Sequence, residues 1–316
     1  MSTIVYVIAY LSIIVFLATV IWKMIDYIRK PPHVRWELYP VPHEKEKSAY
    51  GGSYLEDVDW WKKTKKHSAI GDFIADMPVM VPEILFLKAI WENNRKLWYV
   101  SYPFHLGLYL VAVFIVLVVC GSILQLLGIT AESQSALFSV ITTLTKIIGP
   151  VGFILIIAGG IGLFYKRLTD SKLNDYSAFS HFFNLTLFII TIAIALLTWL
   201  FADQNFNMWR TFMANLISFN MLSMSSPLFM VQVLLAFLLL AYIPLTHMSH
   251  FFMKYFLYHD IRWGDKPNIN TPETDAKIRI VLNYPVTWAA PHIAGHGKTT
   301  WAEVATFNPA AKPEKE

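Results

Sequence analysis

The sequence has a single cysteine, Cys120, and few charged residues. Only 15% of its 316 residues are charged, against about 25% in an ordinary soluble domain. One cysteine excludes a disulfide within the chain, an iron–sulfur cluster held by its own thiolates, and a covalent c-type haem, which needs a C-x-x-C-H motif. A redox centre in this chain would therefore have to be held by histidine or methionine.

Apolar residues are abundant and occur in long runs. They make up 55% of the chain, and the mean hydropathy is +0.46. A run of about 20 apolar residues is long enough to cross a bilayer as a helix. We therefore predict an all-α polytopic membrane protein with five spans, at about 4–27, 101–128, 139–165, 181–202 and 226–257. The N-terminal run lacks a basic region and a small-residue cleavage site, which indicates a retained first span.

The lysines and arginines predict the orientation of these spans. Of the 26 cations, 24 fall on one side of the predicted topology; Arg210 lies on the other side and Lys146 lies within the third span. Because cytoplasmic loops carry the excess of Lys and Arg, we expect the N-terminus outside and the C-terminus in the cytoplasm.

The chain divides into four regions. Residues 1–27 form the first span, and 28–100 form a cytoplasmic loop that begins with an extended Pro-rich stretch. The loop ends in an amphipathic helix that lies on the membrane surface or serves as a docking face for a cytoplasmic partner. Residues 101–257 contain the other four spans and an outer loop, 203–225, with a short amphipathic helix. We expect the tail, 258–316, to be an extended arm laid on a partner subunit.

Two histidines at matched depth are the main candidates for chemistry. His105 lies near the start of the second span and His250 near the end of the fifth. At about 1.5 Å per residue, both are expected about 10 Å deep on the same side of the membrane. An imidazole in hydrocarbon is costly unless something binds it, and two imidazoles from different helices are the usual axial ligands of a b-type haem. We therefore predict that His105 and His250 ligate a haem iron.

Three further side chains are candidates for cofactor contacts. His247 lies one turn from His250, so we interpret it as a haem-propionate or quinone contact, with iron ligation as the lesser option. His181 opens the fourth span and is either an interfacial residue, a quinone-site donor or a ligand to another cofactor. Lys146 is either a quinol-binding or proton-handling cation or a residue that reaches to the outer interface. In the tail, His292 and His296 are weak candidates for metal ligands.

Several motifs resemble a known family. FHLGLYL at 104–110, IAGGIGLFYKRL at 157–168 and IPLTHMSHFF at 243–252 resemble the cytochrome b (gamma) subunit of respiratory nitrate reductase. WELYPVPHE, VPEILFLKAIWENNRKLWYVSYPFH and YPVTWAAPHIAGHGKTTWAEVA resemble more closely the DsrM/HmeC-type membrane cytochrome b of the DsrMKJOP (Hme) complex of sulfate reducers. The equivalent subunit of the Tmc complex is similar as well.

The resemblance implies a function and a set of partners. It implies a subunit of a quinol-linked oxidoreductase complex that passes electrons between menaquinol or menaquinone and a cytoplasmic iron–sulfur subunit resembling heterodisulfide reductase. Other membrane and periplasmic cytochrome subunits would complete the complex, and no nucleic acid is involved. His105 and His250 match the ligands of the cytoplasm-side haem. The positions that hold the outer-side haem are Ile115 and Gln232 here, so we predict one haem b, with a second only through an unusual ligand pair.

Two other functions remain open from the sequence. A haem-free membrane anchor would suit the long loop and tail, but it would leave His105 and His250 without a role. A transporter is disfavoured because the sequence has no internal repeats and few charges within the spans.

Overall fold

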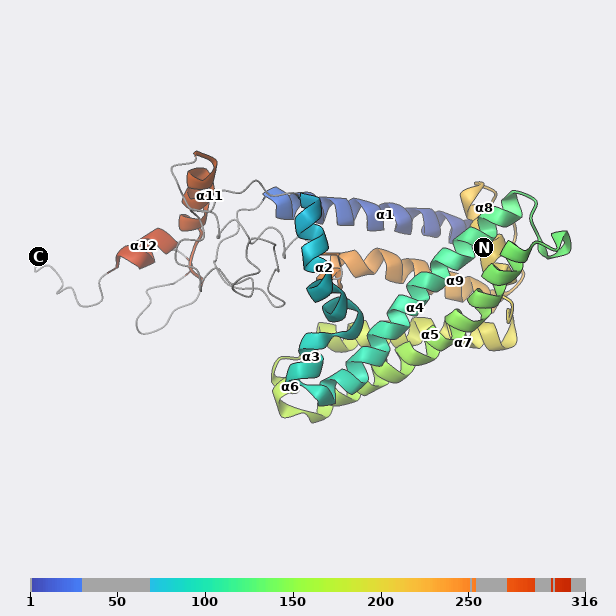
Figure 1. Ribbon diagram of the computed structural model, residues 1–316, viewed down its shortest axis with the longest axis horizontal. Helices are drawn as coiled ribbons and strands as arrows, with labels where there is room; N and C mark the ends of the chain where they lie inside the picture. The colour runs from blue at the N-terminus through green and yellow to red at the C-terminus, as the bar shows by residue number, and fades with distance from the viewer. Residues whose placement is uncertain are drawn as a thin grey trace, which may run out of the picture. The chain divides into compact units, whose positions relative to one another are not determined.

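The part of the chain that the structure describes is helical. A computed structural model describes residues 2–29, 69–250, 252–253, 272–287, 297 and 299–307. Figure 1 shows its helices, which are α1 Ser2–Arg29, α2 Ala69–Phe86, α3 Lys88–Asn93, α4 Arg95–Leu126, α5 Ala136–Thr169, α6 Ser171–Asp175, α7 Phe179–Phe201, α8 Asn207–Ile217, α9 Pro227–Tyr242, α11 Pro272–Leu282 and α12 Trp301–Thr306. The described residues contain no β-strand, only an isolated antiparallel bridge between Pro285 and Thr300.

Five helices are long and apolar enough to cross a membrane. They cover Ser2–Tyr27, Arg95–Leu126, Ala136–Thr169, Phe179–Phe201 and Pro227–Leu245. The predicted class, an all-α multi-pass membrane protein with five spans, is confirmed. The predicted orientation stays a prediction.

The chain forms two compact units. The first comprises Met1–Val20 and Met80–Ser249, and the second comprises Ile21–Val79 and His250–Glu316. Four of the five spanning helices, and the first part of α1, belong to the first unit. The candidate site below is built within that unit alone.

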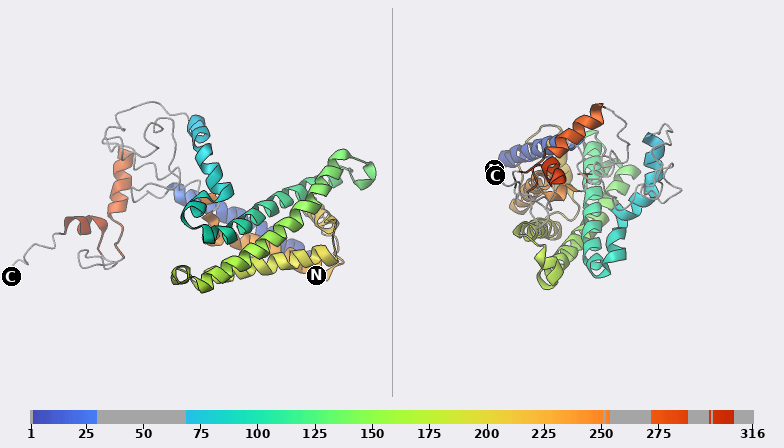
Figure 2. Two further views of the ribbon diagram at one scale, coloured as in Figure 1. Left: turned by 60° about the horizontal axis from the view of Figure 1, so that its bottom comes forward. Right: turned by 90° about the vertical axis from the view of Figure 1, so that its left-hand side faces the viewer.

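Helices α4 and α5 pack antiparallel and very close together. The two run side by side in Figures 1 and 2. Glycines make the approach possible: a Cβ at Gly159 would lie 2.4 Å from the backbone nitrogen of Phe104, and one at Gly107 would lie 2.8 Å from the carbonyl oxygen of Gly152. Small residues let helix backbones approach closely where there is no water to drive association. The close contact fixes the start of α4, where His105 lies.

Helix α7 packs against α5 and also reaches α4. Phe188 of α7 meets Phe104 of α4 edge to face, with ring centroids 5.7 Å apart, and Phe164 meets Phe182 at 5.2 Å. Phe104 and Phe188 belong to a continuous core of buried aromatic and aliphatic side chains. The beginning of α7 is thereby held beside the beginning of α4 and the end of α5.

The short helix α8 caps the opposite end of the first unit and confirms the amphipathic helix predicted within 203–225. The helix begins after Phe206, which has a left-handed φ of 55°. The Phe206 ring packs on Phe114, with ring centroids 4.8 Å apart. The N-terminal part of α1 rests on α8: Tyr6 stacks on Phe212 at 4.9 Å, and the Tyr10 hydroxyl donates to the carbonyl of Leu216 at 2.7 Å.

The fifth span is shorter than predicted. The α-helix ends at Tyr242, and two 3-10 turns follow, Ile243–Leu245 and His247–Ser249. A proline inside a helix removes a backbone donor and its ring clashes with the preceding turn, and Pro244 stands at this break. The prediction of one helix running to residue 257 is wrong, and so is the helical spacing assumed between His247 and His250.

The loop and the tail also differ from the expectation. The predicted surface helix is two helices, α2 and α3, separated by Leu87 with a φ of 53°. The described part of the tail is not an extended arm: it holds α11 and α12, joined by the bridge that brings Tyr284 and Val286 against Thr299 and Trp301. The Pro-rich stretch, His292 and His296 lie outside the described residues.

Candidate functional site

Three of the predicted site histidines lie at one end of the first unit. We call this end, where α4 and α7 begin and α9 finishes, the histidine end. It carries His105 on α4, His181 on α7 and His247 in the turn after α9. His250 belongs to the second unit, so its pairing with His105 stays a prediction.

The ring of His105 is half-buried and has a defined tautomer. Its Nδ1 lies 2.8 Å from the carbonyl oxygen of Ser101, one turn earlier, and 3.4 Å from the Ser101 hydroxyl. A carbonyl oxygen only accepts, so Nδ1 must carry the proton. In the neutral ring Nε2 then keeps its lone pair, which is the arrangement of an imidazole that ligates a metal through Nε2.

His181 has the opposite tautomer. Its Nδ1 accepts the backbone N–H of Ala178 at 2.9 Å, so the proton of the neutral ring is on Nε2. An Nε2–H is a donor, which suits a hydrogen bond to an oxygen better than coordination of iron. The observed bond caps the start of α7, and the roles predicted for His181 stay predictions.

His181 and His247 come together although 65 positions separate them in the sequence. Their rings meet edge to face, with centroids 5.0 Å apart and planes at 67°. The edge of the imidazole at the start of α7 is thus placed against the turn that follows α9. This contact exists because the chain breaks at Pro244 and folds the next turn back toward α7.

A polar pair that sequence reasoning missed lies one turn further into the span. Asn184 is only 5% exposed, and its Oδ1 accepts a hydrogen bond from the Tyr242 hydroxyl at 2.8 Å. The Asn184 Nδ2 has no hydrogen-bond partner among the described residues. The signal was present in the sequence, since an asparagine inside an apolar span is costly and calls for an explanation.

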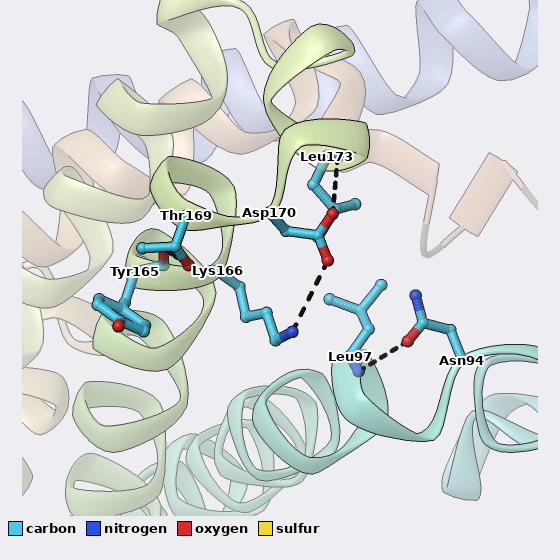
Figure 3. Close-up of polar contacts among 7 residues, drawn as sticks. All are labelled: Asn94, Leu97, Tyr165, Lys166, Thr169, Asp170 and Leu173. Carbon is cyan, nitrogen blue, oxygen red and sulfur yellow. Dashed lines mark hydrogen bonds and ion pairs between the residues drawn. The ribbon is translucent and has the colours of Figure 1, made fainter.

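The ends of α4 and α5 are fixed by local caps and an ion pair at the histidine end. Figure 3 shows the Asn94 side chain accepting from the backbone of Leu97 at 3.1 Å, and Asp170 accepting from Leu173 at 3.4 Å. Lys166 lies 3.7 Å from the Asp170 carboxylate. Side-chain oxygens at these positions satisfy backbone donors that a helix start leaves open.

The side chains of His247 and His250 lie at the surface of the chain. Both residues follow the break after Tyr242 and are not part of α9, and their predicted roles stay predictions. Lys146 is likewise exposed, on the outer surface of α5, so it does not point into the interior of the first unit.

The opposite end of the unit contains a buried charge pair. Asp203 and Arg210 are 6% and 2% exposed. The Asp203 carboxylate accepts the backbone N–H groups of Asn207 and Met208 at 2.8 and 2.7 Å, while Arg210 Nη2 donates to the carbonyl of Asn205 at 2.8 Å. Burial raises the pKa of the Asp203 carboxyl, and these N–H groups and the charge of Arg210 act in the opposite direction.

A comparison with known protein families identifies the family of this chain. Residues 90–263, more than half of the chain, match the nitrate reductase gamma subunit family. The chain belongs to this family. No curated protein and no solved structure matches the chain.

Nitrate reductase gamma subunits are membrane cytochromes b that work in quinone-linked electron transfer. They bind haem b, interact with quinone and function together with other subunits. The matched region begins in α3 and contains α4, α5, α7, α8 and α9, and therefore includes the whole histidine end.

The described residues fit an axial ligand at His105. A six-coordinate haem needs only two protein ligands, because the porphyrin supplies the other four nitrogens. Among the described residues no group of three or more His, Cys, Asp or Glu side chains could hold a metal ion. A haem iron held by two imidazoles needs no such group, so this finding does not argue against a haem. The Nδ1–H of His105 is tied to the backbone, and this orients its Nε2 as a ligand.

The resemblance assigns an outer-side haem to the positions that Ile115 and Gln232 occupy here, and the number of haems stays a prediction. Ile115 is 52% exposed on α4, whereas Gln232 is 2% exposed within α9. Besides lacking an imidazole, the Ile115 side chain points away from the interior of the unit. The aromatic rings of Phe114, Phe153 and Phe206 pack together nearby.

Proposed function

We propose that this chain is the membrane cytochrome b subunit of a respiratory complex linked to sulfate or sulfite reduction. It carries electrons between menaquinol or menaquinone and a cytoplasmic iron–sulfur subunit that resembles heterodisulfide reductase. The family match supports the quinone-linked cytochrome b, and the motifs shared with DsrM/HmeC-type subunits support the complex. The equivalent subunit of the Tmc complex is the alternative.

One haem b, held by His105 and His250 on the cytoplasmic side, is the cofactor arrangement that we propose. The observation that carries it is the hydrogen bond from Nδ1 of His105 to the Ser101 carbonyl, which leaves Nε2 as the ligating nitrogen. Ile115 and Gln232 support the absence of an outer haem. A haem bound here would accept and release one electron at a time.

The chain's own residues provide the surroundings of this cofactor. Gly159 lets the α5 backbone lie against Phe104, which holds the turn of α4 that carries His105 in place. His181 and His247 contribute imidazoles that hold or pass the protons of a quinol at the same side. Lys146, exposed on α5, is the weaker candidate for a quinone contact.

The first experiment measures haem b per copy of this chain in the purified complex. We expect one haem in the wild type and none in His105→Ala or His250→Ala, with His292→Ala as a matched control that keeps its haem. Two haems would overturn the single-haem proposal. Absence of haem from the wild type would leave the haem-free anchor as the better description.

A further inference from the structure

The Asn184 amide at the histidine end is a buried polar group with one of its two polar atoms hydrogen-bonded among the described residues. Its oxygen accepts from Tyr242, and this bond fixes which way the amide points, since only the oxygen can accept a hydroxyl proton. The two N–H groups of Nδ2 are therefore aimed away from Tyr242, and no described residue accepts them. A buried donor without an acceptor destabilises the folded protein, and such groups are uncommon in native structures.

A second donor lies on the same face of α7. His181 and Asn184 are three residues apart, and helix positions with this spacing have their Cβ atoms about 5–6 Å apart. Because Nδ1 of His181 accepts from Ala178, its Nε2–H is a donor too. Two donors on one face, one of them deeply buried, suit a ligand that presents oxygen acceptors.

The surroundings of these donors are aromatic and apolar. Tyr242 meets Phe183 edge to face with ring centroids 5.8 Å apart, and Leu185 and Phe188 of α7 are buried. The His247 ring closes against His181 from the turn after α9. A flat, largely apolar molecule with carbonyl oxygens matches this combination of rings and donors.

We propose that Asn184 donates its Nδ2–H to a carbonyl oxygen of a quinone headgroup bound between the start of α7 and the end of α9, beside the His181–His247 pair. This inference rests on the proposed function, because it assigns the quinone's binding residue. Tyr242 is the positioning residue: its hydroxyl holds the amide so that nitrogen, not oxygen, faces the ligand. A phospholipid ester carbonyl is the other source of the same acceptor chemistry.

The test uses the purified complex and menaquinone-4 as the probe, with bound quinone measured by extraction and chromatography. Asn184→Leu removes the donor, and Asn184→Asp keeps an acceptor for Tyr242 while it replaces Nδ2 with oxygen. We expect both to weaken quinone binding by about tenfold or more, the effect of losing one hydrogen bond in a buried site. Tyr242→Phe should weaken it less, because the donor remains but is no longer oriented.

Thr191→Val is the matched control. Thr191 lies two turns further along α7, is 3% exposed, and its hydroxyl oxygen also has no hydrogen-bond partner among the described residues. Its removal should leave quinone binding unchanged. An equal loss in Thr191→Val and Asn184→Leu would indicate a general disturbance of α7 and overturn the assignment.

Failure of this inference is distinguishable from failure of the proposed function. If the wild type holds haem and binds menaquinone-4 and the Asn184 variants bind it equally well, the assignment of Asn184 is wrong while the function stands. If the variants lose co-purified phospholipid but not quinone, the lipid ester is the acceptor and the assignment is again wrong. If the wild type binds neither haem nor quinone, the proposed function fails first.

Discussion

His105 and His181 show how a backbone hydrogen bond decides what an imidazole is able to do. His105 donates from Nδ1 to a carbonyl, whereas His181 accepts at Nδ1 from an N–H. The first arrangement leaves Nε2 as a ligand and the second leaves Nε2–H as a donor. Both are histidines near the start of an apolar helix, so the sequence does not distinguish their roles.

At the residue scale, Gly159 predicts a test of the α4–α5 contact. In Gly159→Ala the new Cβ would lie 2.4 Å from the backbone nitrogen of Phe104, so the backbone beside His105 must shift. We expect a loss of about 1–3 kcal/mol in stability and a lower haem-to-protein ratio, measured by thermal unfolding and absorption spectra. Gly160→Ala is the control, because its Cβ would meet side-chain atoms and no backbone, with Ile189 at 3.0 Å and the Phe104 ring at 3.6 Å. Equal behaviour of the two variants would contradict the close approach.

At the scale of the element, α8 is held in place by charges that are buried together. Asp203 binds the N–H groups at the start of α8, and Ser122 of α4 donates to the carbonyl of Arg210 at 2.9 Å. A carboxylate at a helix start satisfies open donors and interacts favourably with the helix dipole. The stability of this short helix therefore comes more from its cap and from its contact with α4 than from hydrogen bonds within the helix.

A double-mutant cycle on Asp203 and Arg210 measures this dependence. Each of Asp203→Asn and Arg210→Gln leaves the other charge with its hydrogen bonds but without the opposite charge nearby, so the double variant should be less destabilised than the sum of the two single variants. We expect a coupling of about 1–3 kcal/mol in thermal or denaturant unfolding. The Lys166–Asp170 pair, whose side chains are 25% and 32% exposed, is the comparison and should couple by less than about 1 kcal/mol. Simple additivity at Asp203 and Arg210 would show that the charges do not act together.

At the scale of the whole molecule, the distribution of cations predicts which end of the bundle faces the cytoplasm. The histidine end carries Lys166, Arg167 and Lys172 near the end of α5 and in α6, whereas Arg210 lies at the α8 end. This asymmetry predicts that the histidine end, with the proposed haem and quinone contacts, faces the cytoplasm.

Cysteine labelling in intact cells tests the orientation. In a Cys120→Ser background, Asn220→Cys should react with a membrane-impermeant maleimide, because it lies exposed beyond the α8 end. Asn283→Cys, exposed beside α11, should react only after the cells are permeabilised. The reverse pattern would put the histidine end outside and exclude electron transfer to a cytoplasmic partner from that end.

Features that depend on one stretch of sequence were predicted better than features that depend on contacts between distant residues. The five spans were predicted within a few residues for most boundaries, and the amphipathic helix in the outer loop was predicted as well. The fifth span was predicted too long because its hydropathy continues past Pro244, whereas its α-helix ends at Tyr242. Asn184 was missed because its importance depends on Tyr242, a partner 58 positions away.

The sequence by itself determined that this is a helical membrane protein with five spans. That follows because backbone groups in lipid must be satisfied within each helix, so a span is a property of one stretch of sequence. Only the tertiary structure decided which groups meet: Gly159 against Phe104, His181 against His247, and Asn184 with one free face beside Tyr242. These contacts join positions far apart in the chain, and they depend on how helices pack and where α9 ends, which no single stretch of sequence specifies.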